Sequence, residues 1–124
     1  MSSLQQSDDL AARGAPSPST RVSLADLEAK IAAELYVDVD AIVDANGPGV
    51  ELVQYRTGDR AKSCMTLCMI TTVTGFVLVG KSAPADPVNF DPEKGRTFAR
   101  EDAIRQLWPL EGYLLRDRLH AARP

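Results

Sequence analysis

The stretch from Asn89 to Leu119 constrains the fold most, because it carries the clearest helix start and stop signals in the chain. Asp91 followed by Pro92 is typical of a helix start. The carboxylate can accept from free first-turn amides, and proline has no amide to lose there. Pro109 disfavours a helical backbone at Trp108 and suits the first turn of a new helix. The pattern therefore predicts two C-terminal helices broken at Pro109.

One face of the first of these helices is built from small and apolar residues. At about 100° per residue, the residues sharing that face are Ala99, Ala103, Ile104 and Leu107. Alanines allow a helix to lie close to a sheet, so we expect this face to pack on one. We also expect Trp108 and Phe98 to pack in the core or at the corner between the helices, and Gly112 to mark a close helix crossing.

Arg96 and Arg100 lie one turn apart on the same face, near the helix N-terminus. Their stems could lie along apolar surface while the guanidinium groups reach water or a structural carboxylate. Alternatively, the two groups could form a fork for an anion, such as a nucleotide, with help from Lys81. The candidate ligand-binding residues are therefore Arg96, Arg100 and Lys81.

The segment from Cys64 to Thr72 is apolar on both faces, which is typical of a central strand covered on both sides. Val50 to Arg56 and Phe76 to Gly80 are its expected neighbours, the latter joined through a turn at Thr74-Gly75. Together they predict a three-stranded antiparallel meander. Because the chain has few elements to cover two sheet faces, we expect a homodimer that buries the face or edge left open.

The remaining segments complete an α+β fold. Met1 to Thr20 is polar and interrupted by glycine and prolines, and we expect it to be a disordered tail. Ser23 can cap an N-terminal helix running from Leu24 to about Tyr36. Residues 21–124 are then expected to form a single small domain, with an N-terminal helix, the meander and two C-terminal helices.

Composition limits the classes of function. The net charge of −3 and the pI near 5.1 argue against nucleic-acid binding by bulk charge. The sequence has no run of 18 apolar residues that could span a membrane. Its first residues lack the basic region followed by an apolar stretch that is typical of a signal peptide, so we do not expect a secreted chain. We therefore expect a cytoplasmic location, with Cys64 and Cys68 as two buried thiols.

No group of residues compels a reaction. The only histidine, His120, lies near the C-terminus, and a Ser or Cys nucleophile would need a positioned base. Phosphate-loop and dinucleotide fingerprints do not occur. Asp38, Asp40 and Asp44 superficially resemble a calcium loop but lack its central glycine and closing glutamate. We expect no enzyme activity, no cofactor and no metal.

Residues 64–119 resemble a family of small tailed-phage and prophage proteins, which takes its name from gene products of coliphage N-four and a short-tailed Shigella phage. The resemblance is carried by Gly75-Phe76, Asn89-Phe90-Asp91, Gly95-Arg96, Ala99, Ala103 and, most specifically, the run WPLEGYLL at Trp108–Leu115. It implies phage or prophage origin and an accessory role in the cytoplasm of a bacterial host, with no catalytic residues to carry over. The chain departs from the family pattern in its long segment from Val37 to Lys62.

Three functions follow from these observations. The leading hypothesis is a non-catalytic binding module that docks on a host or phage protein, for example a host defence or replication component, through the sheet edge or the helix corner. The second is the small-anion module that uses Arg96 and Arg100. The third is a virion or assembly component, although the chain has no coiled-coil, repeat or sandwich pattern.

Overall fold

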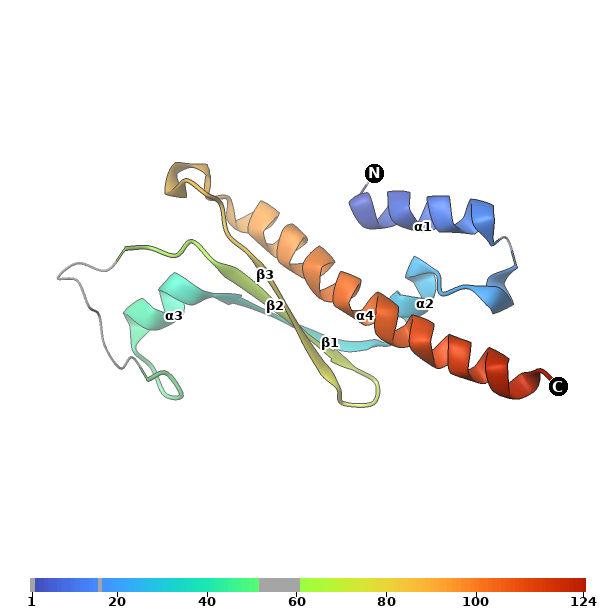
Figure 1. Cartoon of the computed structure of the whole chain (residues 1–124). Coiled ribbons are helices and arrows are strands. Elements are labelled where there is room, and N and C mark those ends of the chain that lie inside the picture. The colour runs from blue at the N-terminus through green and yellow to red at the C-terminus, as the bar shows by residue number, and fades with distance from the viewer. Residues whose placement is uncertain (1, 16, 52–60) are drawn as a thin grey trace.

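A computed structural model describes residues 2–15, 17–51 and 61–124 of the chain. The described residues form an antiparallel sheet of three strands in the order β1-β2-β3, and a long helix, α4, lies along one of its faces (Figure 1). The α+β class predicted from the sequence is confirmed. The elements are α1 Ser3–Gly14, η1 Pro18–Thr20, α2 Leu24–Glu28, β1 Ile31–Asp38, α3 Val39–Ala45, β2 Thr66–Thr72, β3 Val77–Ser82, η2 Pro87–Asn89 and α4 Pro92–Ala122.

Helix α4 begins where the sequence predicts. The Asp91 carboxylate accepts from the amides of Glu93 and Lys94 at 3.0 and 3.3 Å, and Pro92 occupies the first turn. At Pro109 the chain does not separate into two helices but continues as one helix of 31 residues. Proline removes one hydrogen bond, to the carbonyl of Arg105. Arg105 and Pro109 are both exposed, so water can hydrate that carbonyl and the interruption is tolerated.

Small residues let α4 approach the sheet closely, as expected. Ala99 and Ala103 are fully buried against it. A Cβ atom added to Gly80 of β3 would lie 2.0 Å from the Ala99 carbonyl oxygen and 2.5 Å from the Ala103 amide nitrogen. Nearer the start of the helix, a Cβ on Gly95 would lie 2.6 Å from a side-chain oxygen of β2. The close contact between α4 and the sheet therefore depends on Gly80 and Gly95 having no side chain.

The central strand and its hairpin are confirmed, with two changes in detail. Strand β2 is central and pairs with β3 through a turn in which Gly75 has a φ of 86°. The strand begins at Thr66 rather than Cys64, whose φ of 51° places it outside the extended region. The predicted neighbour from Val50 to Arg56 falls almost wholly within residues 52–60, outside the described part of the chain. Its expected place beside β2 is taken by β1.

The predicted N-terminal helix is much shorter than expected. It has the expected cap, in which Ser23 and Asp26 exchange hydrogen bonds, but α2 ends at Glu28. Residues 31–36, predicted to be helical, belong instead to β1. Leu35 pairs with Met69 across the sheet, and cross-strand packing of this kind outweighs a weak local helical preference.

The N-terminal segment, expected to be a disordered tail, contains helix α1. The Ser2 side chain caps it by accepting from the Gln5 amide at 3.1 Å. Leu4 is 3% exposed and joins the core. The Asp8 carboxylate accepts from the Leu24 amide at 3.0 Å and pairs with a nearby arginine. One apolar anchor and one partly buried acceptor order a segment whose overall composition is polar.

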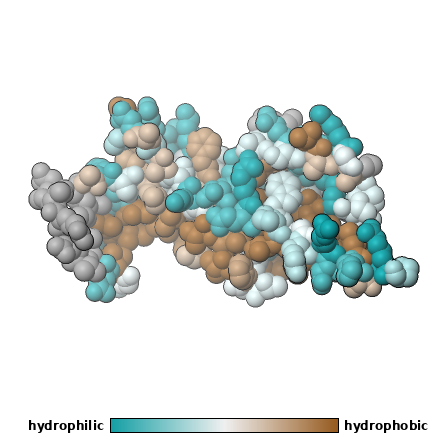
Figure 2. All heavy atoms as spheres, in the orientation of Figure 1, coloured by the Kyte–Doolittle hydropathy of each residue, from teal (hydrophilic) through white to brown (hydrophobic). Residues whose placement is uncertain are grey.

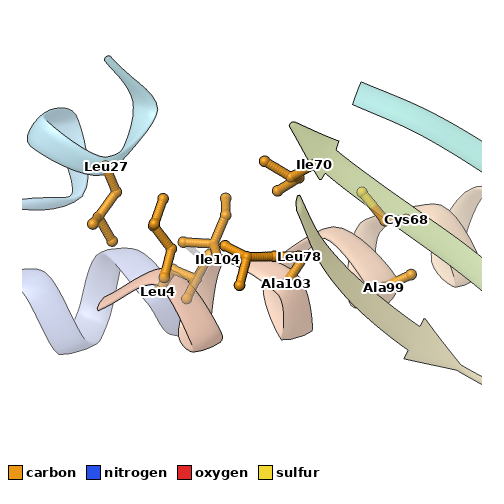
Figure 3. Packing of buried hydrophobic residues seen from close by; sticks show 9 residues of the cluster. Leu4, Leu27, Cys68, Ile70, Leu78, Ala99, Ala103 and Ile104 are labelled. Atoms are coloured by element: carbon orange, nitrogen blue, oxygen red, sulfur yellow. The ribbon is translucent and has the colours of Figure 1, made fainter. Parts of the chain in front are cut away.

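The hydrophobic core lies between the sheet, α4 and the two N-terminal helices. Figure 3 shows Leu4 of α1, Leu27 of α2 and Ile104 of α4 converging at one end, with Ile70 of β2 and Leu78 of β3 beside them. Both thiols, Cys64 and Cys68, are buried and free, as expected. Trp108 packs against this core and donates from Nε1 to the Val22 carbonyl at 2.9 Å.

Two packing predictions for α4 are wrong. Phe98 is 55% exposed and lines a small pocket near Cys64 rather than the core. Gly112 does not mark a helix crossing, since no atom lies within 4 Å of the Cβ position it would have. The continuous α4 provides neither a corner between two helices nor a helix crossing at Gly112.

The sheet face opposite α4 is apolar and partly open to solvent. Alternation along the strands places nine residues on it, and we call this set the outer sheet face: Ala33, Leu35, Val37, Leu67, Met69, Thr71, Val77, Val79 and Lys81. Leu35, Val77 and Val79 are 56%, 44% and 42% exposed. Figure 2 shows hydrophobic residues gathered over the region where the strands lie in Figure 1. The second cover predicted for the sheet is not supplied by α2, which packs on α4.

Candidate functional site

An apolar pocket of about 420 Å³ lies between the second half of α4 and the turn that joins β2 to β3. We call it the motif pocket, because four of its lining residues come from the WPLEGYLL run. It is lined by Lys30, Thr72, Val73, Thr74, Phe76, Leu107, Leu110, Glu111, Tyr113, Leu114 and Arg118.

Helical spacing explains how α4 supplies its wall of the motif pocket. At about 100° per residue, Leu107, Glu111, Leu114 and Arg118 follow one another at intervals of four, three and four on a single face. This spacing runs through Pro109 without interruption, which requires the helix to be continuous. The opposite wall comes from the hairpin turn, whose tight geometry at Gly75 turns the chain back at this point.

The pocket is surrounded by large hydrophobic side chains that remain exposed. Tyr113, Val73 and Phe76 are 74%, 59% and 57% exposed, and Leu114 and Leu110 are 51% and 44% exposed. Leu107, at 4% exposed, joins the pocket to the core. Scattered exposed hydrophobic residues are ordinary, but a group around one hollow is typical of an interaction site.

One charged side chain is buried among these apolar residues. Glu111 is 9% exposed, and its carboxylate lies 3.9 Å from Nζ of Lys30. That distance permits charge attraction but exceeds the length of a hydrogen bond. Within the described ranges, no protein group donates a hydrogen bond to the Glu111 carboxylate, whose side chain is 12% exposed to solvent. The motif pocket thus combines apolar walls with one carboxylate that can accept hydrogen bonds from a bound group.

Arg100, one of the predicted anion-binding residues, is engaged with two carboxylates of the protein. Its Nη1 donates to Glu28 Oε1 at 3.1 Å, its Nη2 pairs with Oε2 of the same carboxylate, and its Nε donates to Glu34 Oε1 at 2.8 Å. The hydrogen bonds to Glu28 raise the pKa of Arg100 above its ordinary value. These contacts agree with the interpretation in which the guanidinium reaches a structural carboxylate.

Burial, together with a hydrogen bond donated to Glu34, raises the pKa of the neighbouring Tyr36 hydroxyl well above its ordinary value. Tyr36 therefore stays protonated at physiological pH and holds the second oxygen of Glu34. The cluster of Arg100, Glu28, Glu34 and Tyr36 joins α4, α2 and β1 through charge and hydrogen bonds. We attribute a structural role to it.

Arg96 and Lys81 are placed differently. Arg96 is exposed and lines a shallow pocket with Arg100, and the acids Glu28, Glu93 and Glu101 line the same pocket. Three carboxylates beside two guanidinium groups give an unfavourable potential for an anion. Lys81 does not line this pocket; it lies on the outer sheet face, and its amide donates to Asp102 at 2.9 Å. The small-anion site stays a prediction.

In the sequence, the WPLEGYLL run carries the family resemblance, but it was not recognised as part of a binding pocket. Once a break at Pro109 is assumed, the four-three-four spacing from Leu107 to Arg118 is divided between two helices and no longer describes one face. The signal that could have found the pocket is an excess of apolar residues, since Leu110, Tyr113 and Leu114 cannot all be buried by a chain this short.

Among the described helices, none is both long enough and apolar enough to cross a membrane. Residues 22–119 match the family model described as "Phage protein (N4 Gp49/phage Sf6 gene 66) family". No curated protein and no solved structure matches the chain. The matched range contains every residue of the motif pocket, whereas α1 precedes it. The chain therefore belongs to the phage protein family named after N4 Gp49 and phage Sf6 gene 66.

Proposed function

We propose that the protein is a non-catalytic binding module, an accessory protein of a phage or prophage, whose motif pocket receives a bulky side chain of a partner protein. One observation supports this most strongly: five exposed hydrophobic side chains gather around one hollow that the family match covers. Burying one such side chain contributes about 1.5–3 kcal/mol, so a pocket of this size can anchor a protein contact.

We propose the cytoplasm of the bacterial host as the location, and a host protein as the partner. Components of host defence or of replication are the classes to test first, because the match to a phage protein family supports a role during infection or lysogeny. The small-anion alternative has less support, because Arg100 already has two carboxylate partners. A virion component has no feature of the described residues in its favour.

Site-specific photo-crosslinking tests the binding role. A photoreactive amino acid replaces Tyr113 at the pocket or, as the matched control, Val88, which is 81% exposed in η2 and lines none of the pockets described above. In host cells we expect a discrete adduct from position 113 and none from position 88. The adduct should disappear when Leu114→Asp is added, since a carboxylate in the pocket opposes apolar docking.

The captured protein is then identified by mass spectrometry, purified and titrated calorimetrically. We expect it to bind the unmodified protein and to lose most of its affinity for Leu114→Asp. Leu114 is half-exposed, so the substitution should leave the fold intact, which circular dichroism checks. Identical adducts from positions 113 and 88, or full affinity for Leu114→Asp, would contradict the proposed function.

A further inference from the structure

Glu111 makes the motif pocket chemically specific. The residue is 9% exposed and its side chain 12% exposed, and within residues 2–15, 17–51 and 61–124 no side chain or amide donates a hydrogen bond to its carboxylate. Lys30 balances its charge from 3.9 Å without donating a hydrogen bond. An ionised carboxylate can accept about four hydrogen bonds, and the Glu111 oxygens retain contact with solvent, which can supply donors. A group that fills the motif pocket displaces this water, so a group that carries its own donor avoids the cost of leaving the carboxylate unsatisfied.

The charges around Glu111 favour a neutral donor. Lys30 and Arg118 also line the motif pocket, so its lining carries two cations and one anion. A side chain bringing a third positive charge would lie beside both cations and be repelled by them. A neutral N–H or O–H would meet the Glu111 oxygen without that repulsion, and its hydrogen bond would still be strengthened by the ionised acceptor.

The walls of the pocket favour a flat apolar body behind that donor. Phe76 and Tyr113 stand at the pocket from the hairpin turn and from α4, and both rings are more than half exposed. Aromatic side chains pack on one another with an attraction beyond their buried area. A pocket of about 420 Å³ lies within the size range of sites that bind small organic groups.

We propose that the motif pocket takes an aromatic side chain that carries its own hydrogen-bond donor, as tryptophan and tyrosine do, and that Glu111 is the acceptor that selects it. This rests on the proposed function and adds the chemistry of the partner's anchor. Tryptophan and tyrosine are also the side chains enriched at the energetic centres of protein interfaces.

Two probes that differ only in the donor test this proposal. The first, 3-methylindole, is the tryptophan side chain, and the second, 1,3-dimethylindole, has its N–H blocked by a methyl group. Each is titrated at millimolar concentration into ¹⁵N-labelled protein while amide signals are followed. We expect both to shift the signals of Leu110, Tyr113 and Leu114, with 3-methylindole binding about tenfold more tightly, as one hydrogen bond to a charged acceptor predicts.

Variants assign that preference to Glu111. In Glu111→Leu the two probes should bind equally, because the apolar pocket remains and the acceptor is gone. Asp117→Leu is the matched control, since it removes a nearby acid from an exposed position on the same helix, and the tenfold preference should persist. If Glu111→Leu does not fold, Glu111→Gln replaces it, and the preference should fall because a neutral amide oxygen accepts more weakly.

Equal affinity of the two probes for the unmodified protein would overturn the role of Glu111 while leaving pocket docking intact. Tighter binding of phenethylammonium than of 3-methylindole would overturn it as well, because the pocket would then select charge. If neither indole shifted the pocket signals, the aromatic anchor would be excluded, and the crosslinking result would still decide separately whether a partner docks at this pocket.

Discussion

Replacing Arg100 by alanine should destabilise the protein, because this side chain ties α4 to two other elements. Its guanidinium holds the Glu28 carboxylate of α2 with two nitrogens and the Glu34 carboxylate of β1 with the third. Without it, two acids remain on α2 and β1, and among the described residues only Glu34 keeps a hydrogen-bond partner, the Tyr36 hydroxyl at 3.0 Å. The two elements lose their charged link to α4.

The size of the effect follows from the partial exposure of the three side chains. Arg100, Glu28 and Glu34 are 28%, 42% and 28% exposed. A fully exposed pair contributes about 0.2–1 kcal/mol, whereas removing one partner of a buried pair costs about 3–5 kcal/mol. Because the exposure of these three side chains lies between the two cases, we expect Arg100→Ala to lower the free energy of unfolding by about 1–3 kcal/mol. For a chain of this length that loss should lower Tm by roughly 3–10 °C.

Thermal unfolding followed by circular dichroism measures the effect, and Arg96→Ala is the matched control. Arg96 lies one turn earlier on α4, is exposed, and makes no ion pair with any residue that the structure describes. Its removal should change stability by less than about 0.5 kcal/mol. Arg100→Lys keeps the charge but not the planar fork, and should fall between the two. In 1 M NaCl the difference between the alanine variants should shrink.

Two results would count against this reasoning. Equal melting temperatures of Arg100→Ala and Arg96→Ala would refute a structural role for the Arg100 cluster. A rise in the Tm of the unmodified protein with inorganic phosphate or nucleotides, lost in Arg96→Ala, would instead support the small-anion site.

Three further predictions follow from packing, burial and the open sheet face. Gly80→Ala should lower the free energy of unfolding by several kcal/mol or prevent folding, since the added Cβ would lie 2.0 Å from a backbone oxygen of α4. Gly112→Ala places its Cβ in open space and should stabilise the helix by about 0.5–1 kcal/mol. Urea unfolding of both variants measures these changes. Burial raises the pKa of Cys68, so its contribution to stability is complete below the ordinary thiol pKa of about 8.5 and is lost as pH rises through the higher folded value. Cys68→Ala should therefore lose less stability between pH 8 and 10 than the unmodified protein. We also predict a homodimer formed through the outer sheet face. Light scattering should detect this dimer, and Met69→Lys should convert it to monomers. A mass of one chain throughout the micromolar concentration range would exclude the dimer.

The features predictable from the sequence are those set by neighbouring residues. The start of α4 depends on Asp91 and Pro92, which are adjacent, and the hairpin depends on a glycine that can adopt a positive φ. Strand β2 was identified because its run is apolar on both faces, whichever residues pair with it. Each of these signals acts within a few residues and is little affected by the rest of the chain.

The features missed depend on residues far apart. Leu24, Leu27, Ile31 and Leu35 have helical spacing, yet Leu35 pairs with Met69, more than thirty residues away. The position of α1 similarly depends on Leu4, which packs in a core formed mainly by residues of β2, β3 and α4. Local propensity cannot anticipate pairing energies of this kind.

The continuity of α4 explains both the wrong prediction at Pro109 and the existence of the motif pocket. A helix of 31 residues is about 46 Å long at 1.5 Å per residue, whereas a strand of seven residues spans only about 23 Å. The helix therefore extends past the sheet (Figure 1). Among the described residues, those of its second half face the hairpin turn, α2 and the segment before α2 rather than the strands. Had the chain bent back at Pro109, Leu110 and Leu114 could have been covered by the first half of the same helix. Because the chain does not bend, these side chains remain exposed around Glu111. The helix tolerates Pro109 in its interior, and this continuity creates the surface on which we propose that a partner docks.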